Sequence, residues 1–201
     1  MSNHKGSGVK QKERAGNSSS YEILDANANS VLRYLLILRG PQCSGKTEIS
    51  EKLKERLHKI EPKKQTYFLK LDEINTDRFE YVLNEALKQK YKYVVGELNY
   101  GDSHTTDPIR TWLLRFKDKD FEILSFVLEA RKEVRLDRCK NDPKRIPFDK
   151  IDEAFFNYDS ETFERFQHIF QEKSGIHQIV LNTENKSSSQ VTDEILGHLR
   201  K

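Results

Sequence analysis

The chain has 201 residues, with 35 Lys and Arg against 32 Asp and Glu, for a formal net charge of +3. This length suits one domain, and a hydrophobic content of 35% supplies enough apolar material for one core. No apolar run is long enough for a membrane-spanning helix, so we expect none. The N-terminal segment lacks the apolar stretch of a signal peptide, which predicts a cytoplasmic protein.

The net charge is concentrated in residues 1–20. This segment holds four basic residues and one acidic residue, which accounts for the whole excess of +3 and leaves residues 21–201 neutral. Its Gly, Ser and Asn content cannot bury a core, so we predict a disordered basic tail and a single domain over residues 21–201. A solubilising tail is favoured over a nucleic-acid-binding arm.

Short apolar runs alternate with stretches of helical hydrophobic periodicity along the rest of the chain. The pattern predicts five strands, over residues 31–38, 66–71, 93–98, 121–128 and 178–181. Helices are expected over residues 46–60, 77–90, 107–116, 131–140, about 148–175 and 191–199. This alternation favours a three-layer α/β/α fold with a parallel sheet. Right-handed crossovers then bring every strand-to-helix loop to the carboxyl edge of the sheet, where a functional site is expected.

The first predicted strand-to-helix loop fits the phosphate-binding pattern G-x-x-x-x-G-K-[ST], also called Walker A. Its residues, in order, are Gly40, Pro41, Gln42, Cys43, Ser44, Gly45, Lys46 and Thr47. The glycines allow the backbone amides to wrap around phosphate oxygens, and the helix that follows adds positive charge at its N-terminus. Lys46 is expected to contact the β- and γ-phosphates, and the Thr47 hydroxyl to ligate Mg²⁺. The loop therefore predicts binding of ATP with Mg²⁺.

Two acidic residues lie at the ends of the second and third predicted strands. Glu97 lies in the third strand beside the loop, where a carboxylate can bind Mg²⁺; a solvent-facing acid is the alternative. Asp72 follows the second strand and would face the same edge, in position to orient an acceptor hydroxyl and accept its proton. A turn acid that caps backbone groups is an equally weighted alternative for Asp72.

A strongly basic helix is predicted after the fourth strand. Arg131, Arg135 and Arg138 are spaced i, i+4 and i+7 and share one face, and Arg145 follows the helix. Residues of about 131–147 would form a lid whose cations meet the charge of the transferred phosphoryl group. We assign this role to Arg138 and Arg145, and for Arg131 we expect a solvated position paired with acidic neighbours.

The two cysteines, Cys43 and Cys139, indicate neither a disulfide framework nor a metal site. Cys43 lies within the predicted phosphate-binding loop, where we interpret it as a small filler residue. The alternative is a reactive thiol near the helix N-terminus and Lys46, whose oxidation or alkylation would block nucleotide binding.

With the loop Gly40–Thr47, the strand-end acids Asp72 and Glu97 and the basic lid, the chain resembles the small P-loop kinases of the adenylate, shikimate and gluconate kinase type. It looks most like the branch that groups zeta toxins, chloramphenicol phosphotransferase and the polynucleotide kinase domain, often catalogued under the AAA label. The resemblance implies the sheet order 2-3-1-4-5. It also favours the acceptor role for Asp72 and the lid role for Arg138 and Arg145. Nothing resembles an NMP-binding insert or a second ATPase subdomain, so a ring ATPase is not expected.

These features predict an Mg²⁺-ATP-dependent phosphotransferase that moves the γ-phosphoryl group onto a hydroxyl of a small-molecule or nucleoside-like acceptor. Lys46, Asp72 and Arg138 would be catalytic, and Thr47 and Glu97 would organise the metal. Two alternatives stay open: a nucleotide-binding switch that hydrolyses ATP slowly, and a nucleic-acid 5′-end kinase, which the neutral body disfavours. The sequence leaves open the acceptor, the preferred purine and the oligomeric state.

Overall fold

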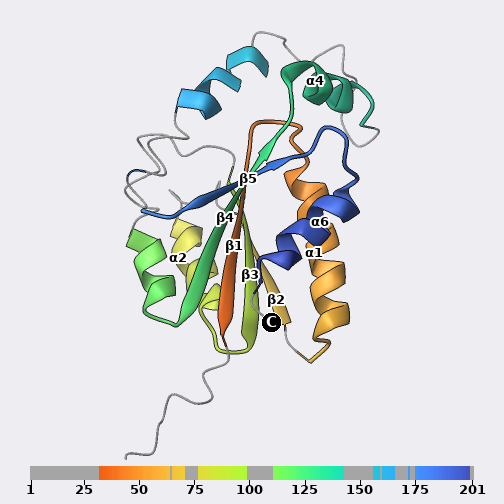
Figure 1. The fold of residues 1–201 in the computed structure, drawn as a ribbon. Coiled ribbons are helices and arrows are strands. Elements are labelled where there is room, and N and C mark those ends of the chain that lie inside the picture. The colour runs from red at the N-terminus through yellow and green to blue at the C-terminus, as the bar shows by residue number, and fades with distance from the viewer. Residues whose placement is uncertain are drawn as a thin grey trace, which may run out of the picture. The chain divides into compact units, whose positions relative to one another are not determined.

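Five parallel strands form the central sheet, in the order β2-β3-β1-β4-β5 (Figure 1). The strands are β1 (Arg33–Arg39), β2 (Gln65–Lys70), β3 (Tyr91–Leu98), β4 (Phe121–Glu129) and β5 (Gln178–Asn182). The computed structural model describes residues 32–63, 65–70, 77–98, 111–142, 156–158, 160–165, 172 and 175–199, all within one compact unit, Val31–Lys201. The predicted fold class and the predicted sheet order are confirmed.

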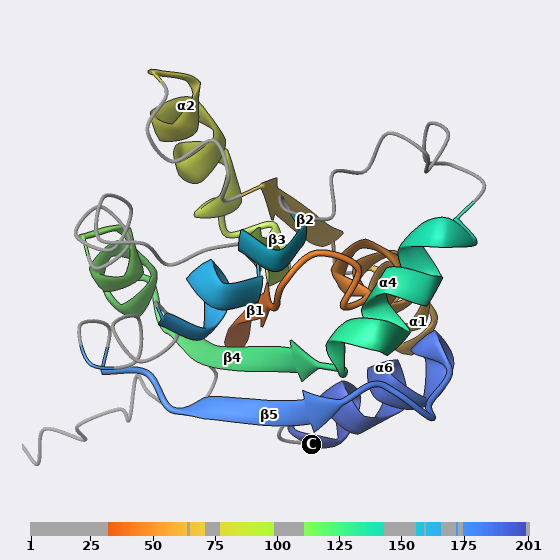
Figure 2. The same ribbon diagram turned by 90° about the horizontal axis from the view of Figure 1, so that it is seen from above.

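Helices cover both faces of this sheet. They are α1 (Lys46–Ile60), α2 (Asp77–Ala86), α4 (Lys132–Lys140) and α6 (Ser188–Gly197), with further helical residues at 111–117, 156–158 and 160–165. In Figure 1, α1 and α6 lie on one face of the sheet and α2 lies on the other. Seen from above in Figure 2, α4 lies beside the start of α1, beyond the carboxyl ends of the strands.

The central strand β1 supplies side chains to a hydrophobic core on each face of the sheet. Leu35 and Ile37 pack with residues of α2 and of the helical segment 111–117. Tyr34, Leu36 and Leu38 point to the opposite face and pack with residues of α1 and α6. This alternation follows from the two-residue period of a strand, and burial on both faces explains why the run is apolar throughout.

The predicted helix bounds hold for α1 and differ at the ends of other elements. α2 ends at Ala86, four residues before the predicted end, and β3 begins at Tyr91. α6 begins at Ser188 rather than at residue 191 because Ser187 caps it. The Ser187 hydroxyl accepts a hydrogen bond from the Gln190 amide, and the Gln190 side chain accepts one from the Ser187 amide at 2.8 Å. The apolar periodicity used for the prediction begins only after this polar capping box.

Arg33, the first residue of β1, closes the amino edge of the sheet. Its side chain is 9% exposed and lies over the ring of Phe121, with its central carbon 3.9 Å from the ring centre. The guanidinium donates hydrogen bonds of 2.6–3.3 Å to four main-chain carbonyl oxygens, those of Leu87, Lys88, Tyr91 and Lys119. Burial lowers the pKa of this guanidinium from its ordinary value.

Several predicted features fall outside the described residues. These are the basic tail over residues 1–20, the acid Asp72, Arg145 and the end of the predicted lid over residues 143–147. They stay predictions. Within the described ranges, no helix combines the length and the apolar character that crossing a membrane requires.

Candidate functional site

The loop Gly40–Thr47 joins β1 to α1 at the carboxyl edge of the sheet. Gly40, Cys43 and Gly45 all have positive φ angles, of 151°, 59° and 99°. A Cβ atom on Gly40 would lie 2.5 Å from Ser44 Oγ and 2.7 Å from a main-chain oxygen of β4, so only glycine fits this position. The Ser44 hydroxyl is buried and has no hydrogen-bond partner among the described residues. The main chain at Gly40 therefore packs closely against the buried side chain of Ser44 in the same loop.

The start of α1 and the side chain of Lys46 give the loop its positive character. Gly45, which precedes α1, has no side chain to cap the amides of the first turn. Uncapped first-turn amides and the helix dipole together form an anion-binding site. Lys46 is 8% exposed, and its Nζ donates hydrogen bonds to the carbonyl oxygens of Gly40 at 2.6 Å and Pro41 at 3.0 Å. The ammonium is thus held against the loop that would carry the phosphates.

Glu97 lies beside the loop because of the strand register. It is paired with Leu38, near the end of β1, so its carboxylate reaches the first turn of α1. Thr47 Oγ1 donates a hydrogen bond of 3.1 Å to Glu97 Oε2, and the Ser50 hydroxyl donates one to Glu97 Oε1. Hydroxyl groups from one helix turn therefore hold both carboxylate oxygens. Ser50 was missed in the sequence, although its i+3 spacing from Thr47 places it on the same side of α1.

The donor set of Thr47 and Glu97 fits Mg²⁺. Magnesium takes oxygen ligands at about 2.1 Å in octahedral geometry, which separates neighbouring ligand oxygens by about 3 Å. The hydroxyl and carboxylate oxygens lie 3.1 Å apart, close to this separation. Magnesium in nucleotide sites usually takes one or two protein ligands and completes its shell with phosphate oxygens and water. These two residues, next to Lys46 and the loop amides, match that pattern.

The side chain of Arg138, in α4, reaches the segment that joins β5 to α6. It donates a hydrogen bond of 3.0 Å to Thr183 Oγ1 and further bonds to the main-chain carbonyl oxygens of Thr183 and Glu184. The Thr183 hydroxyl in turn lies 3.5 Å from the carbonyl oxygen of Ser44, in the loop. The predicted lid arginine is therefore connected to the loop through Thr183.

Arg131 occupies the solvated position that the sequence predicts. Its side chain is 74% exposed and forms an ion pair of 3.1 Å with Glu184. The Arg131 backbone amide also donates to this carboxylate, and this bond together with the ion pair lowers the pKa of Glu184. The acidic neighbour comes from the segment after β5 and not from the same helix. The sequence could not indicate this pairing, because 53 residues separate the two groups.

Arg135 is the arginine of α4 that contacts the loop directly. Its side chain is 4% exposed, and it donates a hydrogen bond of 3.1 Å to the carbonyl oxygen of Gln42 and one of 2.7 Å to Ser160 Oγ. The guanidinium also lies over the ring of Phe156, 4.9 Å from its centre. The i, i+4 and i+7 spacing predicts that Arg135 shares a helical face with Arg138, but it indicates no contact between Arg135 and the loop.

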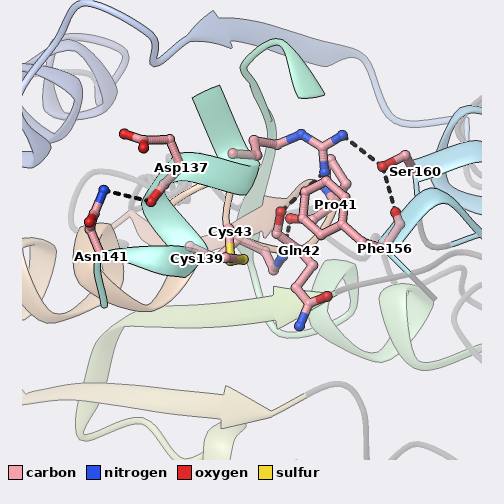
Figure 3. The surroundings of a disulfide bond; sticks show 10 residues. Pro41, Gln42, Cys43, Asp137, Cys139, Asn141, Phe156 and Ser160 are labelled. Carbon is pink, nitrogen blue, oxygen red and sulfur yellow. Dashed lines mark hydrogen bonds between the residues drawn. A yellow bond between two sulfur atoms is a disulfide. The ribbon is translucent and has the colours of Figure 1, made fainter. Parts of the chain in front are cut away.

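A disulfide joins Cys43 of the loop to Cys139 of α4, with the two Cα atoms 5.8 Å apart (Figure 3). The interpretation of Cys43 as a small filler residue is therefore wrong, and so is the prediction that the two cysteines indicate no disulfide. The pairing spans 96 residues and arises because α4 returns to the loop from the end of β4. No short spacing rule connects cysteines so far apart, so the sequence carried no signal for it.

The structure thus brings together Lys46, Thr47 and Glu97 from the predicted site, and it connects Arg138 to Ser44 of the same loop through Thr183. Asp72 and Arg145 lie outside the described residues, so their predicted roles are unchanged by the geometry.

No family model and no curated protein matches this chain. Solved structures match it over 82% of its length. A gluconokinase from Sinorhizobium meliloti is 12% identical, with 90% of its chain covered and a TM-score of 0.53. A fungal RNA kinase is 14% identical, with 83% covered and a TM-score of 0.54. A sugar kinase from Janibacter is 13% identical, with 93% covered and a TM-score of 0.51.

The chain has the P-loop kinase fold. At these sequence identities the likeness concerns the fold and not the substrate. Gly40–Thr47 is the loop after the first strand along the chain, where the Walker A pattern predicts a phosphate-binding loop.

Proposed function

We propose that the chain is an Mg²⁺-ATP-dependent phosphotransferase that moves the γ-phosphoryl group onto a hydroxyl of a small molecule. The observation that carries the proposal is the grouping of Lys46 Nζ, Thr47 Oγ1 and the Glu97 carboxylate around the first turn of α1. A phosphate-binding loop alone specifies nucleotide binding. A hydroxyl and a carboxylate in ligand positions beside it add the means to hold a metal ion on the same phosphates.

The loop and Lys46 would bind the nucleotide phosphates. Backbone amides of the loop point toward bound oxygens in this motif, and they need no movement of side chains to do so. Lys46 would exchange its bonds to the Gly40 and Pro41 carbonyl oxygens for bonds to phosphate, which restores full hydrogen bonding in the bound state. Bound Mg²⁺ would neutralise charge on the β- and γ-phosphates, with Thr47 and Glu97 as its protein ligands.

Asp72, Arg138 and Arg145 complete the proposed machinery. Asp72 would orient the acceptor hydroxyl and accept its proton as the phosphoryl group is transferred. Arg138 and Arg145 would stabilise charge on the transferred group. For Arg138 this role requires the guanidinium to leave Thr183 and Glu184, whose oxygens hold it in the described structure. We propose that nucleotide binding supplies the competing anion.

The acceptors to test first follow from the proteins of similar fold. A gluconokinase and a sugar kinase are among the proteins of similar fold, so sugars and gluconate are the first acceptors to test. A fungal RNA kinase also has a similar fold, so the 5′ end of a nucleic acid is the second acceptor class to test. The neutral charge of residues 21–201 argues against nucleic acid, because binding to a phosphate backbone depends on clustered cations.

The test is transfer from γ-labelled ATP to panels of metabolites, nucleosides and oligonucleotides. Lys46→Ala should lower transfer by about 10²–10³-fold or more, as expected for loss of a group that stabilises the transition state. Lys52→Ala is a matched control, because Lys52 lies on the same helix in an exposed pair with Glu55. Asp72→Asn should abolish transfer and leave ATP binding intact, whereas Asp118→Asn, in an exposed turn, should change neither.

Three results separate the hypotheses. Labelling of a small molecule that depends on both Lys46 and Asp72 supports the proposal. Hydrolysis of ATP without any labelled acceptor, unchanged in Asp72→Asn, would replace it with a slow nucleotide switch. Labelling confined to oligonucleotide 5′ ends would replace the small-molecule acceptor with nucleic acid.

A further inference from the structure

The disulfide Cys43–Cys139 lies within the candidate nucleotide site. Cys43 is the fourth of the eight residues of the predicted phosphate-binding loop and has a φ of 59°, and Cys139 lies near the end of α4. Figure 3 shows the two cysteines meeting between α4 and the loop, with Pro41 and Gln42 beside them. A covalent bond therefore joins the residue that would lie under the phosphates to the helix that covers the loop.

Arg135 holds α4 to the same part of the loop through non-covalent contacts. It lies four residues before Cys139, so the two side chains project from the same face of α4. Arg135 donates to the carbonyl oxygen of Gln42, and Cys139 bonds to Cys43, the next residue along the loop. Two consecutive loop residues are thus fixed to one helix, by one hydrogen bond and one disulfide.

We propose that Cys43 and Cys139 form a thiol–disulfide switch that controls nucleotide binding at this loop, with the oxidised form binding ATP more weakly. The inference rests on the proposed function, because it assumes that the loop binds a nucleotide. On phosphate binding, Lys46 would leave the Gly40 and Pro41 carbonyl oxygens, and in this proposal the loop would adjust around the new ligand. The disulfide restrains that adjustment at Cys43, and reduction leaves Arg135 as the contact between α4 and loop residue 42.

The exchange chemistry balances with a low-molecular-weight disulfide such as oxidised glutathione as the oxidant. The Cys43 thiolate attacks one sulfur of the oxidant, forms a mixed disulfide and releases one thiol. The Cys139 thiolate then attacks Cys43 Sγ and displaces the second thiol. Two cysteine thiols are oxidised to one disulfide, and one small disulfide is reduced to two thiols. A dithiol reductant reverses both steps.

The burial of the two sulfur-bearing residues sets the order of these steps. Cys139 is 1% exposed, whereas Cys43 is only partly buried, so the external disulfide reaches Cys43 first. A nucleotide on the loop would compete with that attack and with the oxidised geometry. Because coupling between two equilibria is reciprocal, ATP must favour the reduced pair by the same factor by which oxidation weakens ATP binding.

The test measures ATP affinity in glutathione buffers of defined oxidised-to-reduced ratio. The full chain is titrated with a fluorescent ATP analogue, and the state of the cysteines is read by alkylation and mass spectrometry in the same samples. Oxidation should raise the Kd of the wild type by about tenfold, within the usual range of coupling between two sites. ATP should shift the ratio at which the disulfide forms toward more oxidising buffer by an equal factor.

Cys139→Ser and Cys139→Ala are the controls, because Cys139 lies outside the predicted nucleotide-binding residues. Both variants should bind the analogue with the affinity of reduced wild type wherever mass spectrometry shows that Cys43 carries no glutathione, because a mixed disulfide at Cys43 is not resolved without Cys139. An equal Kd for verified oxidised and reduced wild type would overturn the switch and leave the proposed function intact, as would cysteines that stay reduced in the most oxidising buffer. Absence of nucleotide binding in both redox states would refute the proposed function itself, and the switch with it.

Discussion

Buried cations lie at opposite edges of the sheet, one at the amino end of β1 and one after the loop that follows its carboxyl end. At the amino edge, Arg33 donates to four main-chain carbonyl oxygens and lies over an aromatic ring. At the carboxyl edge, Lys46 follows the loop after β1 and donates to two carbonyl oxygens of that loop. Both groups donate hydrogen bonds to main-chain carbonyl oxygens. They differ in how many segments of the chain those oxygens come from.

The difference lies in the segments that each cation joins. Arg33 connects the end of α2, the start of β3 and the turn after residues 111–117, so displacing it would separate three elements. Its planar fork fixes all of those contacts at once. The flexible ammonium of Lys46 donates to two carbonyl oxygens of its own loop, and an incoming phosphate can take over those bonds. We infer that the amino edge is built for stability and the carboxyl edge for ligand exchange.

Arg33→Met gives the strongest test of this contrast. The variant keeps an apolar stem against Phe121 but leaves four carbonyl oxygens without their donor, so we expect unfolding free energy to fall by about 3 kcal/mol. Urea unfolding measures the loss. The Kd for an ATP analogue, measured on the folded protein, should equal that of the wild type. A variant of normal stability with weakened nucleotide binding would reverse the roles assigned to the two edges.

Gly40→Ala tests the carboxyl edge by changing the backbone conformation of the loop without removing any polar side chain. A Cβ at this position would lie 2.5 Å from Ser44 Oγ, at a φ of 151° that L-residues rarely adopt, so we expect a loss of about 2 kcal/mol of stability. Nucleotide affinity should fall with it, because the loop must change shape. Gly197→Ala is the matched control: it lies in α6 with no atom within 4 Å of the added Cβ. There, alanine should raise the unfolding free energy by about 0.5–1 kcal/mol, and ATP affinity should not change.

Local patterns in the sequence predicted most of the fold. The apolar run of β1 and the periodicity of α1 are contiguous, and both elements lie where expected. The predicted start of α6 lies three residues after the observed start, because a polar capping box at Ser187 precedes the apolar residues. The sheet order came from the resemblance to P-loop kinases, since strand order depends on how crossovers are arranged and not on any one strand.

The candidate site divides in the same way between local and distant signals. Lys46 and Thr47 belong to one contiguous motif. The position of Glu97 beside the loop could be predicted because the carboxyl ends of parallel strands meet at one edge of the sheet. Arg135 and Cys139 reach the loop only through the path that α4 takes after β4, and their loop contacts span 93 and 96 residues. Contacts of that kind leave no periodic or spacing signal in a single sequence.

Thr183→Val should lower stability less than Arg33→Met does. Unlike Arg33→Met, it should also weaken ATP binding, because Thr183 lies at the carboxyl edge. The buried hydroxyl accepts a hydrogen bond from Arg138 and donates one of 3.0 Å to the Glu129 carbonyl oxygen, next to Ser44 of the loop. Valine keeps the shape and removes both bonds, so we expect a loss of about 1–2 kcal/mol in urea unfolding. ATP affinity should weaken as well, because Thr183 connects α4 to the loop. Thr183→Ser should restore both measurements, and a loss of stability alone would limit Thr183 to a structural role.

The smallest effect is expected from pH at the amino edge, through Glu85. Hydrogen bonds from Lys88 and from Lys90 lower the pKa of its carboxyl to about 2, with a further contribution from the Tyr91 hydroxyl at 3.2 Å. Because this pKa in the folded protein lies below the ordinary value of 4.5, the stabilisation is complete above pH 4.5 and is lost as pH falls toward about 2. Exposed ion pairs contribute little, so the change in urea midpoint should be small and should shrink further at high salt.

Glu85→Gln removes the titrating group and should flatten the fall in stability between pH 4.5 and about 2 relative to the wild type. At neutral pH its ATP affinity should match that of the wild type, because Glu85 pairs with groups around the start of β3, at the edge away from the loop. An unchanged acid profile in Glu85→Gln would show that these pairs do not stabilise the folded state. A change in ATP affinity would instead show that the two edges of the sheet are coupled. The assignment of stability to the amino edge and of ligand binding to the carboxyl edge would then be wrong.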